Sequence, residues 1–416
     1  MIGIQSYWSD PKIDARLNSS QRQLSLAISA IPDDRSLKLA LNICLVLDCS
    51  GSMAQKPLTM VKQAALDLVE RLNPSDRLSV IAFNHRAKVV VPNQVAANID
   101  IKIDIKQKIE SLAADGGTSI DEGLRLGLKE VAAYNQGCVS RIFLLTDGEN
   151  EHGDDRRCLR LAELSAEHNV TIDTLGFGEH WDRDVLEQIS DLARGTLSYI
   201  EQPERTTLEF ERLLHRAQSV GLTNSSLTVE LMPKTRLGGL KPVAQVAPET
   251  IELPVQLQGN HFSVRLGDLA SDRPRIVLLN LYINQLPPGR HKIAAVQLRY
   301  DAPGVNRVNL HSDVLVIELS AENPYQPQPN DLVHERILAL AKYRQTQIAE
   351  AKLQDGDRAG AVTMLQTAAK TALQLGDKAG ATVLQTNATR LQIGKELSNR
   401  DLKKTRLVSK TILWQE

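Results

Sequence analysis

Short apolar runs alternate with helix-period segments from residue 37 to residue 220, and this alternation constrains the fold more than any other feature of the sequence. The first run, LKLALNICLVLD at 37–48, is almost continuously apolar, as expected for a strand that is buried on both faces. The segment 57–72 then places apolar residues on one helical stripe. Strands that alternate with helices through short connections predict a doubly wound α/β domain built on a parallel sheet.

The rest of this region continues the same order. We expect further strands at 77–84, 139–150, 170–178 and 196–201, a strand at 87–92 antiparallel to its neighbour 77–84, and helices at 106–114, 120–134, 156–169, 183–193 and 204–219. In a sheet of this type, functional side chains gather at the carboxyl ends of the strands.

Both flanks of the α/β region have the pattern of β structure. Apolar and polar residues alternate between Pro, Gly and Asn turns in a series of segments, namely 12–17, 22–31, 227–233, 261–269, 275–284, 291–300 and 312–320. We therefore expect residues 1–36 to fold back and complete an antiparallel β-sandwich with residues 221–321. The α/β domain at 37–220 would then be inserted in this sandwich.

The C-terminal part of the chain is predicted to be helical. Residues 322–330, ENPYQPQPN, contain three prolines and predict a stiff extended linker. Within the helical region 331–416, the hexapeptide GDRAGA that starts at Gly356 recurs as GDKAGA from Gly376, so each Gly can end a helix and each following Asp can cap the next. Two interpretations stay open. One is a helical hairpin array loosely similar to tetratricopeptide repeats, with a groove for a partner peptide. The other is a three-helix bundle that closes the β domain.

Composition excludes several classes of function. The 49 Lys and Arg residues balance 50 Asp and Glu residues, so the chain lacks the basic excess of a nucleic-acid-binding protein. The N-terminus lacks the pattern of a secretory signal, and the most apolar stretch, 37–47, is too short to span a membrane. The cysteines, Cys44, Cys49, Cys138 and Cys158, are scattered without ligand-like spacing, and we expect a cytoplasmic location.

Polar residues follow three elements of the predicted α/β domain. Asp48, Ser50 and Ser52 follow the first strand, Thr118 lies in the loop before the helix at 120–134, and Asp147 follows the strand that starts at residue 139. Two carboxylates and three hydroxyls form an oxygen-only set of ligands. Such a set suits hard cations, with Mg²⁺ expected first and Mn²⁺ or Ca²⁺ as alternatives.

These residues resemble the metal-ion-dependent adhesion site (MIDAS) of von Willebrand factor A (VWA) domains, which have a Rossmann-like fold. The family pattern of D-x-S-x-S, a later Thr and a later Asp at a strand end is complete here, over roughly residues 37–200. By this resemblance, Ser50, Ser52 and Thr118 bind the ion directly or alternate with water, and Asp48 and Asp147 act directly or through bound water. The sixth position is left for a carboxylate of a partner protein.

The resemblance implies a divalent-cation-dependent protein interaction module rather than an enzyme. Intracellular prokaryotic relatives often work with AAA+ ATPases of the MoxR or chelatase type, as adaptors that pass ATP-driven remodelling to a target. We therefore expect an intracellular adaptor or scaffold whose partner supplies an acidic side chain to the metal.

Two other classes of function remain as alternatives. A metal-dependent hydrolase could use Asp48 as the nucleophile of a D-x-D motif, but Ser50 occupies the place of the second aspartate, and neither a P-loop nor a G-x-S-x-G motif is present. A structural scaffold could bind its partners through the C-terminal helices alone. In that case the Asp-Ser loop would merely turn the chain and cap the helix at 57.

Further polar and aromatic residues lie in the expected loops. The four histidines of this region, His85, His152, His168 and His180, are interpreted as surface residues. Glu149, Glu151, Asp154 and Asp155 form an acidic cluster that is either simply solvated or repels other acidic surfaces. Trp181 is interpreted as a packing residue, with a contact role as the alternative.

Overall fold

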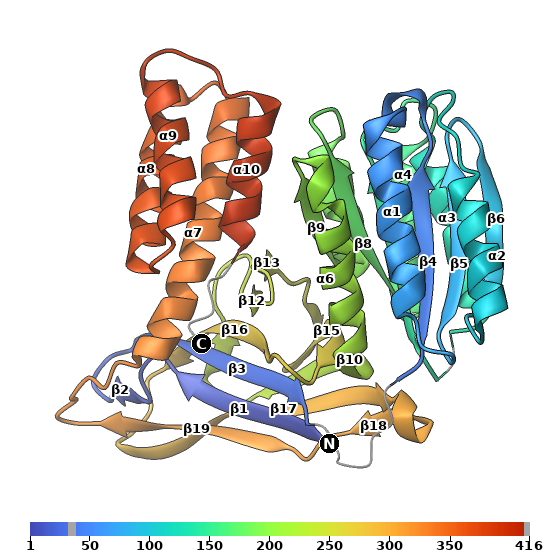
Figure 1. Ribbon diagram of the computed structural model, residues 1–416. Coiled ribbons are helices and arrows are strands. Elements are labelled where there is room, and N and C mark those ends of the chain that lie inside the picture. The colour runs from blue at the N-terminus through green and yellow to red at the C-terminus, as the bar shows by residue number, and fades with distance from the viewer. Residues whose placement is uncertain (32–38, 136, 412–416) are drawn as a thin grey trace. The chain divides into compact units, whose positions relative to one another are not determined.

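In the computed structural model, which describes residues 1–31, 39–135 and 137–411, the chain divides into two units (Figure 1). The first, called the β-rich unit, contains Met1–Ile31, Ser225–Tyr300 and Asn309–Glu416, with two sheets and the C-terminal helices. The second, called the α/β unit, contains Pro32–Asn224 and Asp301–Val308. The boundary predicted between residues 36 and 37 lies outside the described residues.

The α/β unit is built on one sheet with the strand order β6-β5-β4-β7-β8-β9. Neighbouring strands are parallel except for β6, which is antiparallel to β5. The strands are β4 (Leu41–Asp48), β5 (Arg77–Phe83), β6 (Ala87–Val95), β7 (Val139–Thr146), β8 (Val170–Phe177) and β9 (Arg194–Ile200). This confirms the doubly wound sheet that the alternation predicts.

Helices cover both faces of this sheet. One hydrophobic core joins the sheet to α1 (Lys56–Arg71), α2 (Ile99–Glu110) and α6 (Thr206–Gln218). The other joins it to α3 (Ile120–Ala132), α4 (Asp155–Glu167) and α5 (Arg183–Leu192). Because both faces are covered, β4, β7 and β8 are buried along their whole length, which explains the almost continuous apolar run of β4 and the apolar centre of β7. The charged residues that are buried with them, Arg141 of β7 and Asp173 of β8, form an ion pair at 2.9 Å.

Helix α2 differs most from the sequence prediction, which places a helix at 106–114. The helix begins earlier, after Asn98, whose side chain accepts a hydrogen bond from the N–H of Ile101 at 3.0 Å. Its sequence, IDIKIDIKQKIE, alternates with period 2, and Ile99 and Ile103 remain exposed. The apolar residues of α2 therefore do not recur with the helical period in most of its sequence, and the pattern does not indicate where the helix begins.

The β-rich unit contains two sheets. The first has the order β1-β3-β16-β12-β13, with β11 paired to β16, and the second has the order β14-β15-β10-β17-β19-β2, with β18 paired to β17. Their strands are β1 (Ile2–Trp8), β2 (Lys12–Asp14), β3 (Ser19–Ala30), β10 (Val220–Leu231), β11 (Thr235–Leu237), β12 (Val243–Ala247), β13 (Ile251–Glu252), β14 (Gln256–Gln258), β15 (His261–Ala270), β16 (Arg275–Asn284), β17 (Gly289–Ala302), β18 (Arg307–His311) and β19 (Leu315–Glu322).

The first sheet combines strands that precede the α/β unit in the sequence with strands that follow it. Figure 1 shows the blue strands β1 and β3 beside β16, and β3 pairs antiparallel with β16 from Ser19 to Ile28. The sequence analysis missed β1, β12 and the short strands β11, β13, β14 and β18. Strands of two to seven residues carry too little periodicity to distinguish them from loops.

The segment predicted as a linker is attached to the N-terminal strands. The hydroxyl of Tyr325 donates a hydrogen bond to Oδ2 of Asp10 at 2.6 Å, and the N–H of Gln328 donates to the same oxygen at 3.1 Å. The guanidinium of Arg22 also donates to the hydroxyl of Tyr325 at 3.0 Å. The segment 322–330 is therefore held against the N-terminal strands by these hydrogen bonds.

The helical region contains α7 (Asp331–Gln354), α8 (Arg358–Gln374), α9 (Lys378–Gln392) and α10 (Asn399–Lys410). Val333 of α7 packs against the first sheet, on Ala27, Ile276 and Leu278. The repeated Gly-Asp turns act as expected: Gly356 and Gly376 have φ of 77° and 74°, and each following Asp accepts the N–H of the glycine three residues later at 2.8 Å. No helix among the described residues is long and apolar enough to cross a membrane.

Candidate metal centre

The predicted ligands lie at the carboxyl edge of the α/β sheet, where the order of the strands reverses. After β4 the chain adds β5 on one side, and β7 then pairs with the other side of β4. Asp48 is the last residue of β4, and Asp147 follows the last residue of β7. Open α/β sheets bind their ligands at such a reversal.

Four hydrogen bonds connect the two aspartates into one cluster. Oδ1 of Asp48 accepts the backbone N–H of Ser50 at 2.7 Å, and its Oδ2 accepts the hydroxyl of Thr146 at 2.6 Å. The hydroxyls of Ser50 and Ser52 are 3.0 Å apart, and Ser52 donates to Oδ1 of Asp147 at 2.7 Å. The D-x-S-x-S loop therefore spans the gap between two neighbouring strand ends.

Thr118 reaches the same cluster from a different part of the chain. The N–H of Gly51 donates to the carbonyl oxygen of Gly116 at 2.8 Å, which joins the Thr118 loop to the D-x-S-x-S loop. A Cβ placed on Gly148 would lie 3.2 Å from Oγ1 of Thr118, so this hydroxyl lies against the turn that follows Asp147. All five predicted ligands thus converge, although they come from three separate loops.

Burial gives the two carboxylates an unusual electrostatic environment. Burial raises the pKa of Asp48 to about 6, although hydrogen bonds from Thr146 and Ser50 act against it. Burial also raises the pKa of Asp147, opposed by the hydrogen bond from Ser52. Within the described part of the chain, neither carboxylate forms an ion pair with Lys or Arg. Asp147 also has the imidazole of His180 nearby, which lowers its pKa. Two buried acids that lack a Lys or Arg partner are costly to ionise unless a cation joins them.

The donor set fits a hard divalent cation. Its donors are carboxylate and hydroxyl oxygens, and the five predicted ligands include no imidazole and no thiolate. Ser52 is exposed whereas Asp48, Ser50 and Thr118 are buried, so the cluster opens to solvent on the side of Ser52. One role was missed by the sequence analysis: Thr146 holds the second oxygen of Asp48.

Comparisons with known proteins identify the two recognisable parts of the chain. The von Willebrand factor type A domain matches residues 42–210, and the Sll0103-like C-terminal alpha-helical domain matches residues 331–415. The protein sll0103 of Synechocystis sp. (strain ATCC 27184 / PCC 6803 / Kazusa) is 57% identical over 412 residues, which cover 99% of this chain and 97% of that protein. The chain belongs to the sll0103 family.

More distant relatives share less of the chain. Inter-alpha-trypsin inhibitor heavy chain H2 of Mus musculus is 27% identical over 195 residues, which cover 44% of this chain and 20% of that protein. Among solved structures, a von Willebrand factor type A protein from Catenulispora acidiphila matches with a TM-score of 0.83 at 18% identity, over 100% of this chain and 97% of that one. The ArnB paralog VWA2 from Sulfolobus acidocaldarius matches with a TM-score of 0.56 at 15% identity, over 98% of each chain. These structures show that the fold extends over the whole sll0103-family chain.

Trp181 of this sll0103-family VWA domain is a packing residue. Its side chain is 3% exposed, and its indole N–H donates to the carbonyl oxygen of Gly178 at 3.0 Å. A Cβ on Gly176 would lie only 2.2 Å from the indole ring, so the glycine makes room for it. The packing interpretation is correct, and a surface contact through this indole is excluded.

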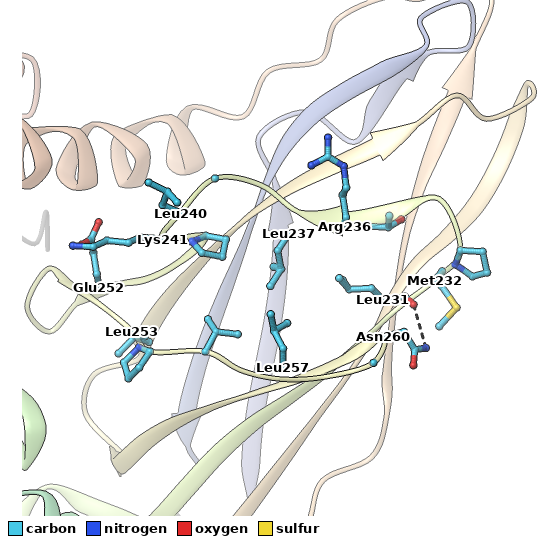
Figure 2. A pocket seen from close by; sticks show the side chains of 17 residues that line it. Leu231, Met232, Arg236, Leu237, Leu240, Lys241, Glu252, Leu253, Leu257 and Asn260 are labelled. Carbon is cyan, nitrogen blue, oxygen red and sulfur yellow. Dashed lines mark hydrogen bonds and ion pairs between the residues drawn. The ribbon is translucent and has the colours of Figure 1, made fainter.

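A groove also lies in the β-rich unit, and none of the five predicted ligands lines it. It is an apolar groove of about 910 Å³ between β11 and the segment 253–260 (Figure 2). In Figure 2, Leu237 and Leu257 approach each other across the groove, and the side-chain amide of Asn260 donates to the carbonyl oxygen of Leu231 at 3.5 Å. Leu240 and Leu257 are exposed at its margin.

Proposed function

We propose that this protein is a divalent-cation-dependent protein interaction module whose VWA domain carries a complete MIDAS. The ligands are Asp48, Ser50, Ser52, Thr118 and Asp147, and the preferred ion is Mg²⁺, with Mn²⁺ or Ca²⁺ as alternatives. The observation that carries the proposal is the convergence of two buried carboxylates and three hydroxyls at one strand reversal, with no Lys or Arg paired to either acid among the described residues.

Neighbouring groups of the chain would hold the carboxylate ligands in place at this site. The hydroxyl of Thr146 and the N–H of Ser50 fix the two oxygens of Asp48, and Ser52 fixes Asp147. A divalent ion bound by two protein carboxylates keeps the ability to attract a further carboxylate, which a partner protein would supply. The exposed side of the cluster at Ser52 is the direction from which such a partner would arrive.

The proposal does not include catalysis. Cys49 follows Asp48 directly, but burial raises the pKa of its thiol to about 11, so it is a poor nucleophile at neutral pH. Ser50 stands where a D-x-D hydrolase has its second aspartate, and Asp48 is fully held by hydrogen bonds rather than directed at a substrate.

We further propose a cytoplasmic adaptor or scaffold of the intracellular prokaryotic type, with a MoxR-type AAA+ ATPase as a candidate partner. The four cysteines are free, which suits a reducing compartment. If partners bind the C-terminal helices instead, recovery of partners should not depend on a cation. Affinity purification in Mg²⁺ or in chelator, read by mass spectrometry, separates the two possibilities.

Titration calorimetry with Mg²⁺, Mn²⁺ and Ca²⁺ tests the site directly. Asp48→Asn and Asp147→Asn should abolish cation binding at millimolar ion, since they remove the two formal charges, whereas Ser52→Ala should weaken it less because contacts to charged groups are about twice as strong as neutral ones. Thr118→Ala should reduce partner recovery more than cation affinity, as the resemblance to MIDAS implies.

Glu151→Gln is the matched control, because it removes an exposed acid from the loop that follows Asp147 without touching the cluster. It should bind the cation like the wild type. No uptake of any of the three ions by the wild type, even with acetate present, would exclude the metal-dependent function and leave the scaffold alternative.

A further inference from the structure

Two exposed histidines lie directly against the loop that carries Thr118. His85 lies between β5 and β6, and a Cβ placed on Gly116 would come within 2.3 Å of its Nδ1. His152 lies between β7 and α4, and a Cβ on Gly117 would come within 2.4 Å of its Cε1. The two imidazole rings thus contact adjacent residues of one loop, and a larger residue at either position would displace the ring that contacts it.

This contact places both rings at the edge of the metal cluster. The carbonyl oxygen of Gly116 accepts the hydrogen bond from Gly51 of the D-x-S-x-S loop. The backbone N–H of His152 donates to the carbonyl oxygen of Thr118 at 3.0 Å. Both side chains are nevertheless exposed to solvent. A partner segment that reaches the cluster from the exposed side of Ser52 would therefore meet the imidazoles next.

The charges around the cluster indicate what kind of group the imidazoles would bind. Glu149 and Glu151 are on the same loop as His152, and they repel an acidic partner. The imidazole N–H groups are hydrogen-bond donors, and Arg86 follows His85 in its loop. Donors at this position would offset the repulsion and orient a carboxylate.

We propose that His85 and His152 form a subsite for a second carboxylate of the partner, beside the carboxylate that the cation binds. The inference rests on the proposed function and specifies its partner: an extended acidic segment with two carboxylates close in sequence. Both rings adjoin the loop that carries Thr118, and an extended chain advances about 3.3 Å per residue, so we place the second acid within a few positions of the first.

Binding of labelled short peptides to the full-length protein, measured by fluorescence anisotropy in Mg²⁺, tests this subsite. Each peptide has a central Glu, and a second Glu, Gln or Ala is placed at each of the neighbouring positions. The wild type should prefer one Glu-containing arrangement over its Gln counterpart by about tenfold, as expected for hydrogen bonds to a charged group. His85→Ala and His152→Ala should each reduce this preference severalfold, and Mg²⁺ affinity, measured by calorimetry, should stay unchanged.

Two comparisons distinguish a binding role from a structural one. His85→Gln and His152→Gln keep a side-chain N–H donor and should retain most of the preference. His168→Ala removes an exposed histidine beyond the C-terminus of α4, next to the start of β8 and thus at the opposite edge of the same sheet, and should change nothing.

Each remaining outcome is decisive. Equal binding of Glu and Gln peptides by the wild type in Mg²⁺ would refute the subsite and leave the metal-dependent function standing. Absence of any Mg²⁺-dependent peptide binding would refute both. A preference that survives in the doubly substituted His85→Ala, His152→Ala protein would place the second carboxylate elsewhere.

Discussion

At the scale of single residues, the two Gly-Asp turns of the helical region show how one motif acquires two different roles. Asp377 and Asp357 cap α9 and α8 identically. Asp377, however, accepts a second bond at 2.9 Å from Lys342, whose side chain is only 2% exposed and which also donates to the carbonyl oxygen of Thr411 at 2.9 Å. The equivalent pair of Asp357 with Lys352 lies at the surface. Burial lowers the pKa of Lys342, although Asp377 opposes this shift.

Replacement of Lys342 by Met should therefore destabilise the helical region strongly. It leaves the Asp377 carboxylate buried without its cation while the cap to Gly380 survives, and the expected loss is about 3 kcal/mol of unfolding free energy. Lys352→Met is the matched control and should cause little change, because its partner is solvated. Urea denaturation followed by circular dichroism measures both. Similar midpoints for the two variants would mean that the buried pair contributes no more than the exposed one.

At the scale of elements, helix α3 lies close to the sheet because two glycines face it. A Cβ on Gly123 would come within 2.9 Å of Phe83, and a Cβ on Gly127 within 2.7 Å of Val46. In an isolated helix both glycines would be unfavourable by about 1 kcal/mol relative to Ala. Their cost is offset here by the close packing that they allow between α3 and β4.

Gly127→Ala should consequently destabilise the protein, against the direction that helix propensity gives. We expect a loss of about 1–3 kcal/mol from overpacking against Val46, measured by chemical denaturation. Lys129→Ala, at an exposed position of the same helix, should stay close to the wild type. A more stable Gly127→Ala protein would show that propensity dominates and that Val46 yields at no cost.

At the scale of the whole molecule, the first sheet of the β-rich unit depends on strands from the start of the chain. Strand β3 lies between β1 and β16 in the first sheet, and it fully buries Leu24, Leu26 and Ile28. Burial of three such side chains contributes about 5–9 kcal/mol, which is comparable with the total stability of an ordinary domain. The α/β unit, in contrast, contains every strand of its own sheet between residues 41 and 200.

Fragments of the chain should therefore differ in their ability to fold. Residues 39–220 alone should unfold cooperatively on heating, whereas residues 221–416 alone should not, because the first sheet lacks β1 and β3. Addition of a peptide comprising residues 1–31 should restore the transition in the second fragment. Differential scanning calorimetry measures all three samples. A cooperative transition of 221–416 without the peptide would contradict the requirement for the N-terminal strands.

The sequence by itself determined the parts whose burial follows a local period. The runs 43–47 and 142–145 are apolar because both faces of the sheet are covered, and the five proposed ligands are recognisable from their spacing and from their places after strand ends. The turns at Gly356 and Gly376 are equally local, since a left-handed glycine followed by a capping Asp is specified within a few residues.

Only the tertiary structure decided the rest. Helix α2 has a period-2 sequence and became a helix through its cap and its place in the core, and the short edge strands formed because neighbouring strands offered them hydrogen bonds. His85 and His152 were indistinguishable from His168 in the sequence, yet two of them adjoin the cluster and one does not. The physical reason is that periodicity reports only which face of a segment is buried. Contacts between residues far apart in the chain depend on how the separate elements pack.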